Sequence, residues 1–246
     1  MPFHTHRFPN GLQLIGETIP SSRSAAVGFF VQTGARDETP SESGVSHFLE
    51  HMMFKGTPRR SALDVNLDFD RIGANYNAYT SEENTVYYAA VLPEYLPKAV
   101  DILADILRPS LRQDDFDTEK QVILEEIKMY EDAPGSMAWD NARRIHFAAH
   151  PLGNSILGTT ASVTALSRDQ MHGYFERRYA PGNVLAVAAG NFEWDRLVDL
   201  VGGACGSWTP GDGGRPDAGE TAGSGGCHTI TKEGTAQEHV LILSAG

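Results

Sequence analysis

The amino-acid sequence predicts an α+β fold in which a mixed, largely antiparallel sheet is covered by helices on one side. Short segments rich in β-branched and aromatic residues alternate along the chain with longer segments of helical periodicity. Two turn signals, Asn10-Gly11 and residues 81–84, each join two strand segments into a hairpin. Strands that lead into helices on one sheet face form a two-layer α+β domain.

Each predicted element has a local pattern that supports it. Strands are expected where residues alternate in polarity or are apolar throughout, at 3–8, 12–18, 25–33, 75–80, 85–91 and 184–189. Helices are expected where apolar residues recur at helical spacing, at 44–55, 62–72, 93–107, 115–146, 168–178 and 194–201. Pro134-Gly135 should break the longest of these helices, because proline cannot donate a backbone hydrogen bond.

Composition and charge exclude several classes of protein. The chain has 246 residues, of which 41% are hydrophobic, and this suffices for one large domain with its own core. A net charge of −12 disfavours a nucleic-acid partner, since phosphate binding needs clustered lysine and arginine. No apolar run reaches the length of a membrane span, and residues 1–7 lack the apolar core of a secretory signal. The start at Met1 without a presequence favours a bacterial cytoplasmic protein.

The composition changes beyond Val201. Residues 202–226 are dense in Gly, Pro, Asp and Ser, which is typical of a linker. After this segment, residues 228–231 and 238–244 have the pattern of strands. Cys205 and Cys227 are too few and too poorly spaced for a zinc module of their own, and a reducing cytoplasm would leave them as thiols.

The most informative short motif is His47-Phe48-Leu49-Glu50-His51. Residues i and i+4 are neighbours on a helix, so the imidazoles of His47 and His51 can bind one metal ion. Glu50 is then placed to act as general base toward a water molecule at that ion. The order H-x-x-E-H is the inverted form of the zinc-peptidase motif H-E-x-x-H, and we therefore expect Zn²⁺ as the cofactor.

The residues around the motif favour a metal site. Between residues 44 and 55 the segment is apolar nearly all round, which predicts a buried helix with Ser43 as its N-cap and Gly56 at its end. A buried polar group without a partner costs about 1 to 3 kcal/mol, and one divalent cation would satisfy the two histidines and Glu50 together. The alternative is a buried helix whose histidines find other hydrogen-bond partners.

A third ligand is expected from the helix at 115–132, because a catalytic zinc normally has three protein ligands. Glu119 and Glu126 fall on the predicted buried stripe, whereas Glu125 falls on the solvated face. The apolar members of this stripe are Phe116, Val122, Ile123, Met129 and Tyr130. We therefore predict Glu126 as the third ligand and Glu119 as a supporting group that hydrogen-bonds a ligand. The alternative is that both glutamates pair with lysine or arginine elsewhere.

Ordered matches along almost the whole chain resemble the pitrilysin or insulinase family of inverted-motif zinc peptidases, above all its mitochondrial-processing-peptidase β-subunit type and the bacterial relatives of that type. The matching stretches are 12–20, 34–38, 44–57, 77–80, 84–88, 122–127, 150–153, 156–158 and 179–183. The resemblance implies that His47, His51 and Glu126 bind zinc, that Glu50 is the base and that Glu119 supports the site. These are the positions that the residue pattern also predicts.

The resemblance also implies how the chain is organised. It implies the N-terminal half of a two-domain protein, with a peptidase domain at 1–204, a linker at 205–227 and the first strands of a second domain at 228–246. In the family the second half supplies an arginine and a tyrosine that help hold the substrate. The strand at 75–80 would receive the substrate peptide as an added strand, which makes Asn77 and Ala78 expected substrate contacts.

The expected function is therefore that of a zinc-dependent endopeptidase that hydrolyses peptide bonds in short or unfolded peptides, alone or within a homo- or heterodimer. One alternative is a non-catalytic structural or peptide-binding subunit of the same family, which the complete motif disfavours. Another is a lyase that uses the inverted motif with a cysteine ligand. The Gly-rich surroundings of Cys205 and Cys227 disfavour that alternative.

Overall fold

A six-stranded sheet organises the computed structural model, with the strand order β1-β2-β6-β3-β5-β4. The structure describes residues 3–215, 217–220, 223–232, 234 and 236–244. The strands are β1 (Phe3–Arg7), β2 (Gln13–Thr18), β3 (Ala25–Val31), β4 (Asn75–Thr80), β5 (Thr85–Val91) and β6 (Val184–Gly190). β2 and β6 run parallel, whereas the other neighbouring pairs are antiparallel. The predicted mixed, largely antiparallel sheet is therefore confirmed.

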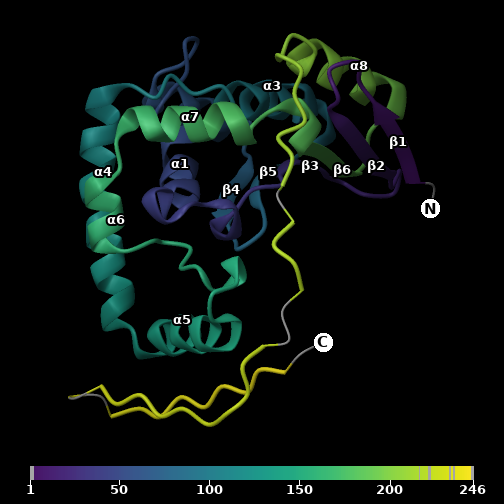
Figure 1. Cartoon of the computed structure of the whole chain (residues 1–246). Helices are drawn as coiled ribbons and strands as arrows, with labels where there is room; N and C mark the ends of the chain where they lie inside the picture. The colour runs from purple at the N-terminus through teal and green to yellow at the C-terminus, as the bar shows by residue number, and fades with distance from the viewer. Residues whose placement is uncertain (1–2, 216, 221–222, 233, 235, 245–246) are drawn as a thin grey trace.

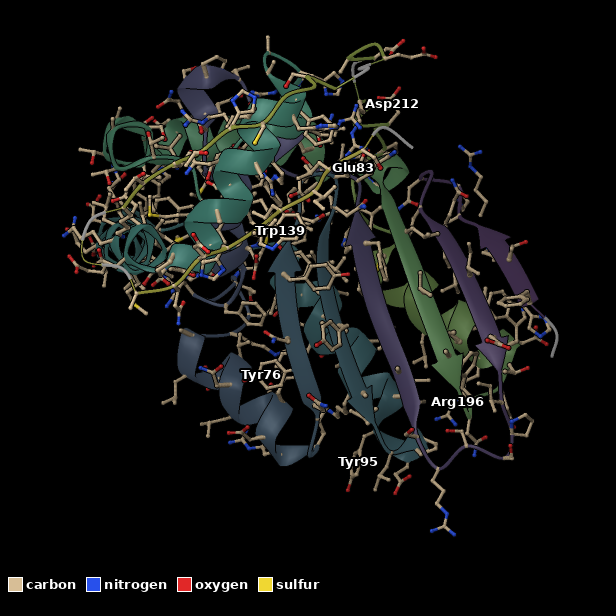
Figure 2. The ribbon with its side chains drawn as sticks, turned by 90° about the horizontal axis from the view of Figure 1, so that it is seen from below. Tyr76, Glu83, Tyr95, Trp139, Arg196 and Asp212 are labelled. Carbon is tan, nitrogen blue, oxygen red and sulfur yellow. The ribbon has the colours of Figure 1, made fainter. Side chains whose placement is uncertain are left out.

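Helices cover one face of this sheet (Figure 1). In the described part of the chain they are α1 (Val45–Met53), α2 (Ala62–Arg71), α3 (Leu96–Ile106), α4 (Gln113–Asp132), α5 (Pro134–Phe147), α6 (Thr160–Ala165), α7 (Arg168–Arg178) and α8 (Trp194–Cys205). α3 lies against β3 and β5, and α1 lies against β4 and β5. Figure 2 looks onto the opposite face of the sheet, which these helices leave largely open. The predicted one-sided cover is thus confirmed.

Local sequence explains how the sheet forms. In the first hairpin Gly11 adopts a left-handed conformation with φ +99°, and Asn10 Oδ1 accepts a hydrogen bond from the amide of Leu12. Asn-Gly suits such a turn because glycine reaches positive φ without a steric cost. The central strand β3 is buried at four alternating positions, from Ala25 to Val31, with exposures of 1% or less. None of the helices in the described residues is long and apolar enough to cross a membrane.

Helix α4 continues past α1 toward α5, and the two helices separate where predicted, just before Pro134 (Figure 1). The apolar stripe expected on α4 is buried in part. Phe116 and Ile123 are buried, but Val122, Met129 and Tyr130 are 47%, 70% and 47% exposed. The prediction is wrong for these last three residues. Val122 lies at the margin of the buried face, and the residues from Lys128 to Asp132 at the end of α4 are all exposed.

The two strands expected at 228–231 and 238–244 are not formed. These segments are extended and largely exposed below α5 in Figure 1, and Val240 and Ile242 are 84% and 91% exposed. An alternating pattern indicates which residues would share a face of a strand, but a strand also needs a partner edge. Among the described residues no such edge pairs with these segments.

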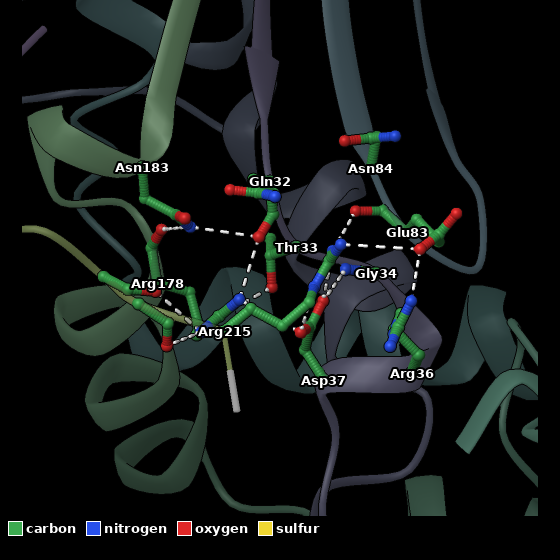
Figure 3. Close-up of polar contacts among 12 residues, drawn as sticks. Gln32, Thr33, Gly34, Arg36, Asp37, Glu83, Asn84, Arg178, Asn183 and Arg215 are labelled. Carbon is green, nitrogen blue, oxygen red and sulfur yellow. Dashed lines mark hydrogen bonds and ion pairs between the residues drawn. The ribbon is translucent and has the colours of Figure 1, made fainter. Parts of the chain in front are cut away.

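The first part of the predicted linker is anchored to the domain (Figure 3). The guanidinium of Arg215 donates to both carboxylate oxygens of Asp37, at 2.8 and 2.9 Å. Arg178, at the end of α7, lies 3.1 Å from the same carboxylate and donates to the carbonyls of Gly213 and Gly214, each at 2.7 Å. The Asp37 side chain is only 1% exposed, so two arginines hold one buried carboxylate. Residues 213–215 are therefore fixed rather than a free tether.

We predict that Arg215→Ala releases this part of the linker. Removing one charged hydrogen-bond partner should cost about 1 to 3 kcal/mol locally, and protease cleavage between residues 211 and 227 should become several-fold faster. Limited proteolysis with mass-spectrometric mapping of the cut sites measures this change. Arg71→Ala is the matched control, since Arg71 is exposed and pairs with Asp68 on the same helix. Equal cleavage rates in the two variants would contradict the prediction.

Candidate metal centre

The motif helix α1 presents both histidines toward the same region. His47 is buried and His51 is half-buried, and their ring centroids lie 4.7 Å apart. Burial, and then the neighbouring His51, lower the pKa of His47 to about 3. The His47 ring is therefore neutral at pH 7, which is the form that binds a metal ion.

The start of α1 is held by a residue that the sequence analysis missed. Ser43 does not cap the helix, and Gly44 occupies the N-cap in a left-handed conformation with φ +90°. The Glu38 carboxylate accepts hydrogen bonds from the amides of Gly44 and Ser46, at 2.7 and 2.8 Å. Burial raises the pKa of Glu38 to about 8, against the effect of these two amides. The cap prediction was wrong because the oxygen comes from a side chain several residues upstream of the helix.

Helix α4 places Glu126 beside both histidines. Its Oε2 atom lies 3.8 Å from His47 Nε2 and 3.6 Å from His51 Nε2. These separations are too long for N–H···O hydrogen bonds. They are close to the spacing of about 3.4 Å between ligands that surround one zinc ion tetrahedrally. In the described part of the chain these three residues form the group of side chains that could hold a metal ion, with ligand atoms within 4.8 Å of one another.

The donor set also fits the chemistry of zinc, which takes neutral imidazole nitrogen and carboxylate oxygen. Glu125, the neighbour of Glu126, points away from the site, with a side chain that is 71% exposed and paired with Lys128. Periodicity along α4 predicted this difference between the two glutamates. Cys205 is buried and Cys227 is exposed, both are free thiols, and neither belongs to the group around the histidines.

Glu119 contacts His51 and is not itself one of the three expected metal ligands. Its Oε1 atom is 2.9 Å from His51 Nδ1, and its Oε2 atom is 2.6 Å from Lys55 Nζ. Burial by itself would raise the pKa of Glu119, but the hydrogen bonds from His51 and Lys55 lower it. An ionised Glu119 accepts a hydrogen bond from the protonated Nδ1 of His51, and this leaves the Nε2 lone pair of His51 free to bind a metal ion. For His47 Nδ1, no partner lies among the described residues.

Lys55 is a second residue that supports the site and that the sequence analysis missed. It lies four residues after His51, so the two side chains share one side of the motif segment and reach the same carboxylate. That spacing was a usable signal. Burial by itself lowers the pKa of His51, but the hydrogen bond with Glu119 and the charges of Glu126, Glu119 and Glu50 outweigh it and raise the pKa.

Glu50 lies on α1 between the histidines and faces the end of strand β4. Its Oε2 atom accepts a hydrogen bond of 2.6 Å from the hydroxyl of Thr80. Burial raises the pKa of Glu50, and the Thr80 hydroxyl opposes the shift. Sequence reasoning did not find Thr80, because the alignment of α1 with β4 is a tertiary property.

Asn77 and Ala78 lie on β4, which is an edge strand of the sheet. The amide of Ala78 donates to the side-chain oxygen of Asn77 at 2.8 Å, so this amide points away from β5. Edge strands carry such unpaired backbone groups, and they can be used to bind another strand.

This geometry defines a class of site. Two histidines one turn apart and a glutamate from a second helix converge on one point, and a further glutamate lies between the histidines in sequence. A fold of this kind with such a site is that of an inverted-motif zinc metalloprotease.

Comparisons with known proteins agree with this class. The model of the insulinase family, peptidase family M16, matches residues 14–160, and that of the peptidase M16 inactive domain matches residues 165–244. The chain belongs to the insulinase family, peptidase family M16, and the resemblance found in the sequence is confirmed. Zinc, the expected cofactor, agrees with the names of the relatives and with the donor set.

Individual relatives show how much of the chain is covered. An uncharacterised zinc protease of Streptomyces coelicolor is 43% identical over 194 residues, which are 78% of this chain and 42% of that protein. The mitochondrial-processing peptidase subunit beta of Saccharomyces cerevisiae is 39% identical over 198 residues, which are 80% of this chain and 43% of that protein. A protease from Helicobacter pylori matches in fold with a TM-score of 0.82 at 23% identity, over 85% of this chain and 51% of that one. The chain thus spans about half the length of these relatives.

We predict that substitutions of the two neighbouring glutamates of α4, Glu125 and Glu126, differ in their effect on zinc affinity. Glu126→Gln should lower zinc affinity by at least about a hundredfold, and Glu119→Gln by about ten- to a hundredfold through His51. Competition with a chromogenic chelator measures the affinity. Glu125→Gln is the matched control and should bind zinc like the wild type. A loss of zinc in Glu125→Gln equal to that in Glu126→Gln would contradict the assignment.

Proposed function

We propose that this chain is the catalytic domain of a zinc-dependent endopeptidase that cleaves peptide bonds in short or unfolded peptides. The observation that carries the proposal is the convergence of His47, His51 and Glu126, with Glu50 on the same helix as the two histidines. The family assignment supports a metalloprotease, and the complete set of motif residues favours a catalytic rather than a purely structural subunit.

In this proposal each residue has a defined task. His47, His51 and Glu126 would hold zinc, and Glu119 would keep the His51 ring in the orientation that exposes Nε2. Zinc, when bound, supplies Lewis-acid chemistry that polarises a carbonyl and makes a nearby water molecule more acidic. The Glu50 carboxylate takes the proton from the attacking water and later delivers it to the leaving amine.

Strand β4 is the proposed binding surface for the substrate. An extended peptide that pairs with this edge would offer a carbonyl to the Ala78 amide in place of the Asn77 side chain, which now accepts that hydrogen bond. Because edge pairing needs an extended backbone, a folded protein would be a poor substrate. This restriction is the physical reason for proposing short or unfolded peptides.

A second unit of similar fold, within one protein or in a homo- or heterodimer, is proposed to complete the site. The chain spans about half the length of its relatives, and the inactive-domain model matches residues 165–244. The division into a domain at 1–204, a linker at 205–227 and a second domain from 228 stays a prediction, as does a cytoplasmic location.

We predict that Glu50→Gln keeps zinc but loses cleavage. Removing a general base should reduce kcat by about 10²- to 10⁴-fold, while zinc content stays near that of the wild type. Cleavage of a quenched fluorescent peptide library by the full-length protein, with and without a chelator, measures the activity. Glu125→Gln serves as a control that keeps full activity. If Glu50→Gln cleaves like the wild type, Glu50 is not the base, and a metal-free wild type would favour the structural subunit.

We predict that Ala78→Pro weakens peptide binding without unfolding the sheet. Proline is tolerated on an edge strand where the amide points outward, so the pairing of β4 with β5 should persist. The substitution removes the amide that would meet the substrate, and KM should rise about tenfold with unchanged zinc content. Ala78→Val, which keeps the amide, is the control. An unchanged KM in Ala78→Pro, with the fold intact by circular dichroism, would exclude this amide from substrate binding.

A further inference from the structure

We propose that Thr80 is a positioning residue for Glu50 and couples the general base to the strand that receives the substrate. This inference rests on the proposed function and adds a residue to it. The Thr80 hydroxyl donates to Glu50 Oε2 at 2.6 Å. Thr80 is the last residue of β4, two residues after Ala78 on the same edge.

The contact has the geometry of a strong, directional hydrogen bond. Hydroxyl-to-carboxylate hydrogen bonds of about 2.5 to 2.7 Å are charge-assisted and stronger than neutral ones. Threonine is β-branched, so its χ1 angle is restricted and its hydroxyl holds a fixed direction. Glutamate has several rotatable bonds, so its carboxylate needs a partner to hold one position. Among the described residues, the side chain that donates a hydrogen bond to the Glu50 carboxylate is that of Thr80.

The position of Thr80 on β4 also relates this hydrogen bond to the proposed substrate-binding edge. Backbone groups along a strand alternate in direction, so the amide of Thr80 should point off the same edge as the amide of Ala78. A peptide paired with Ala78 would therefore lead directly toward the Glu50 carboxylate, about 7 Å further along the strand. Thr80 would therefore hold the Glu50 carboxylate at the end of the edge along which the peptide pairs.

Two substitutions at Thr80 test this inference in the full-length protein. Thr80→Val removes the hydroxyl and keeps the shape, and Thr80→Ser keeps the hydroxyl. We expect kcat to fall about ten- to a hundredfold in Thr80→Val, with KM and zinc content unchanged, and to recover to within about threefold in Thr80→Ser. Thr5→Val, on the exposed part of β1, is the control and should keep wild-type kcat.

Several outcomes would overturn the inference. A wild-type kcat in Thr80→Val would show that the hydroxyl does not position the base. Parallel losses of zinc or a matching rise in KM would show a purely structural role. A crystal structure of Thr80→Val gives a readout that does not need activity. We expect the Glu50 carboxylate in more than one rotamer, and a single unchanged rotamer would contradict the proposal.

A double-mutant cycle separates this inference from the proposed function. If Glu50→Gln keeps wild-type kcat, the proposed function fails. If Glu50→Gln is inactive while Thr80→Val behaves like the wild type, the positioning role alone fails. If Thr80 acts through Glu50, adding Thr80→Val to Glu50→Gln should cause no further loss, because the effect of the hydroxyl needs the carboxylate.

Discussion

The packing of α4 on α1 is the constraint on which the site depends. The rings of Phe48 and Phe116 stack at 4.7 Å with an interplanar angle of 18°, and Ile123 continues the buried face of α4. Burying each of these side chains contributes about 1.5 to 3 kcal/mol. This apolar contact fixes the rotation of α4 about its own axis, and the rotation decides that Glu126 faces the histidines. The metal centre is thus positioned by its hydrophobic neighbours.

Charge at the site favours a cation. The carboxylates of Glu50, Glu119 and Glu126 converge near two histidines, and Lys55 is the lysine that pairs with one of them. Glu119 is balanced by Lys55 and by its hydrogen bond with His51. The carboxylates of Glu50 and Glu126 then remain near each other in a partly buried site, where their mutual repulsion is weakly screened. One divalent ion would offset both charges, which explains why acidic side chains and a neutral imidazole occur together here.

Local patterns predicted the parts of the molecule that depend on nearby residues. The six strands of the sheet, every helix except α6, the break at Pro134 and the opposite facing of Glu125 and Glu126 follow from residue patterns within one element. Features that depend on how elements meet could not be predicted in this way. They are the Glu38 cap of α1, the Thr80 contact, the exposure of Met129 and Tyr130, and the arginine pair that holds residues 213–215. Each needs the relative placement of segments far apart in the chain.

The hydrogen bond between Asn77 and the Ala78 amide has a consequence for solubility. An exposed strand edge is a template on which a second molecule can add its own strand and begin to aggregate. By folding its carboxamide back onto the amide, Asn77 gives that donor a partner within the same strand. The edge thus stays accessible to a peptide that can compete for the amide, while chance self-association between copies becomes less favourable.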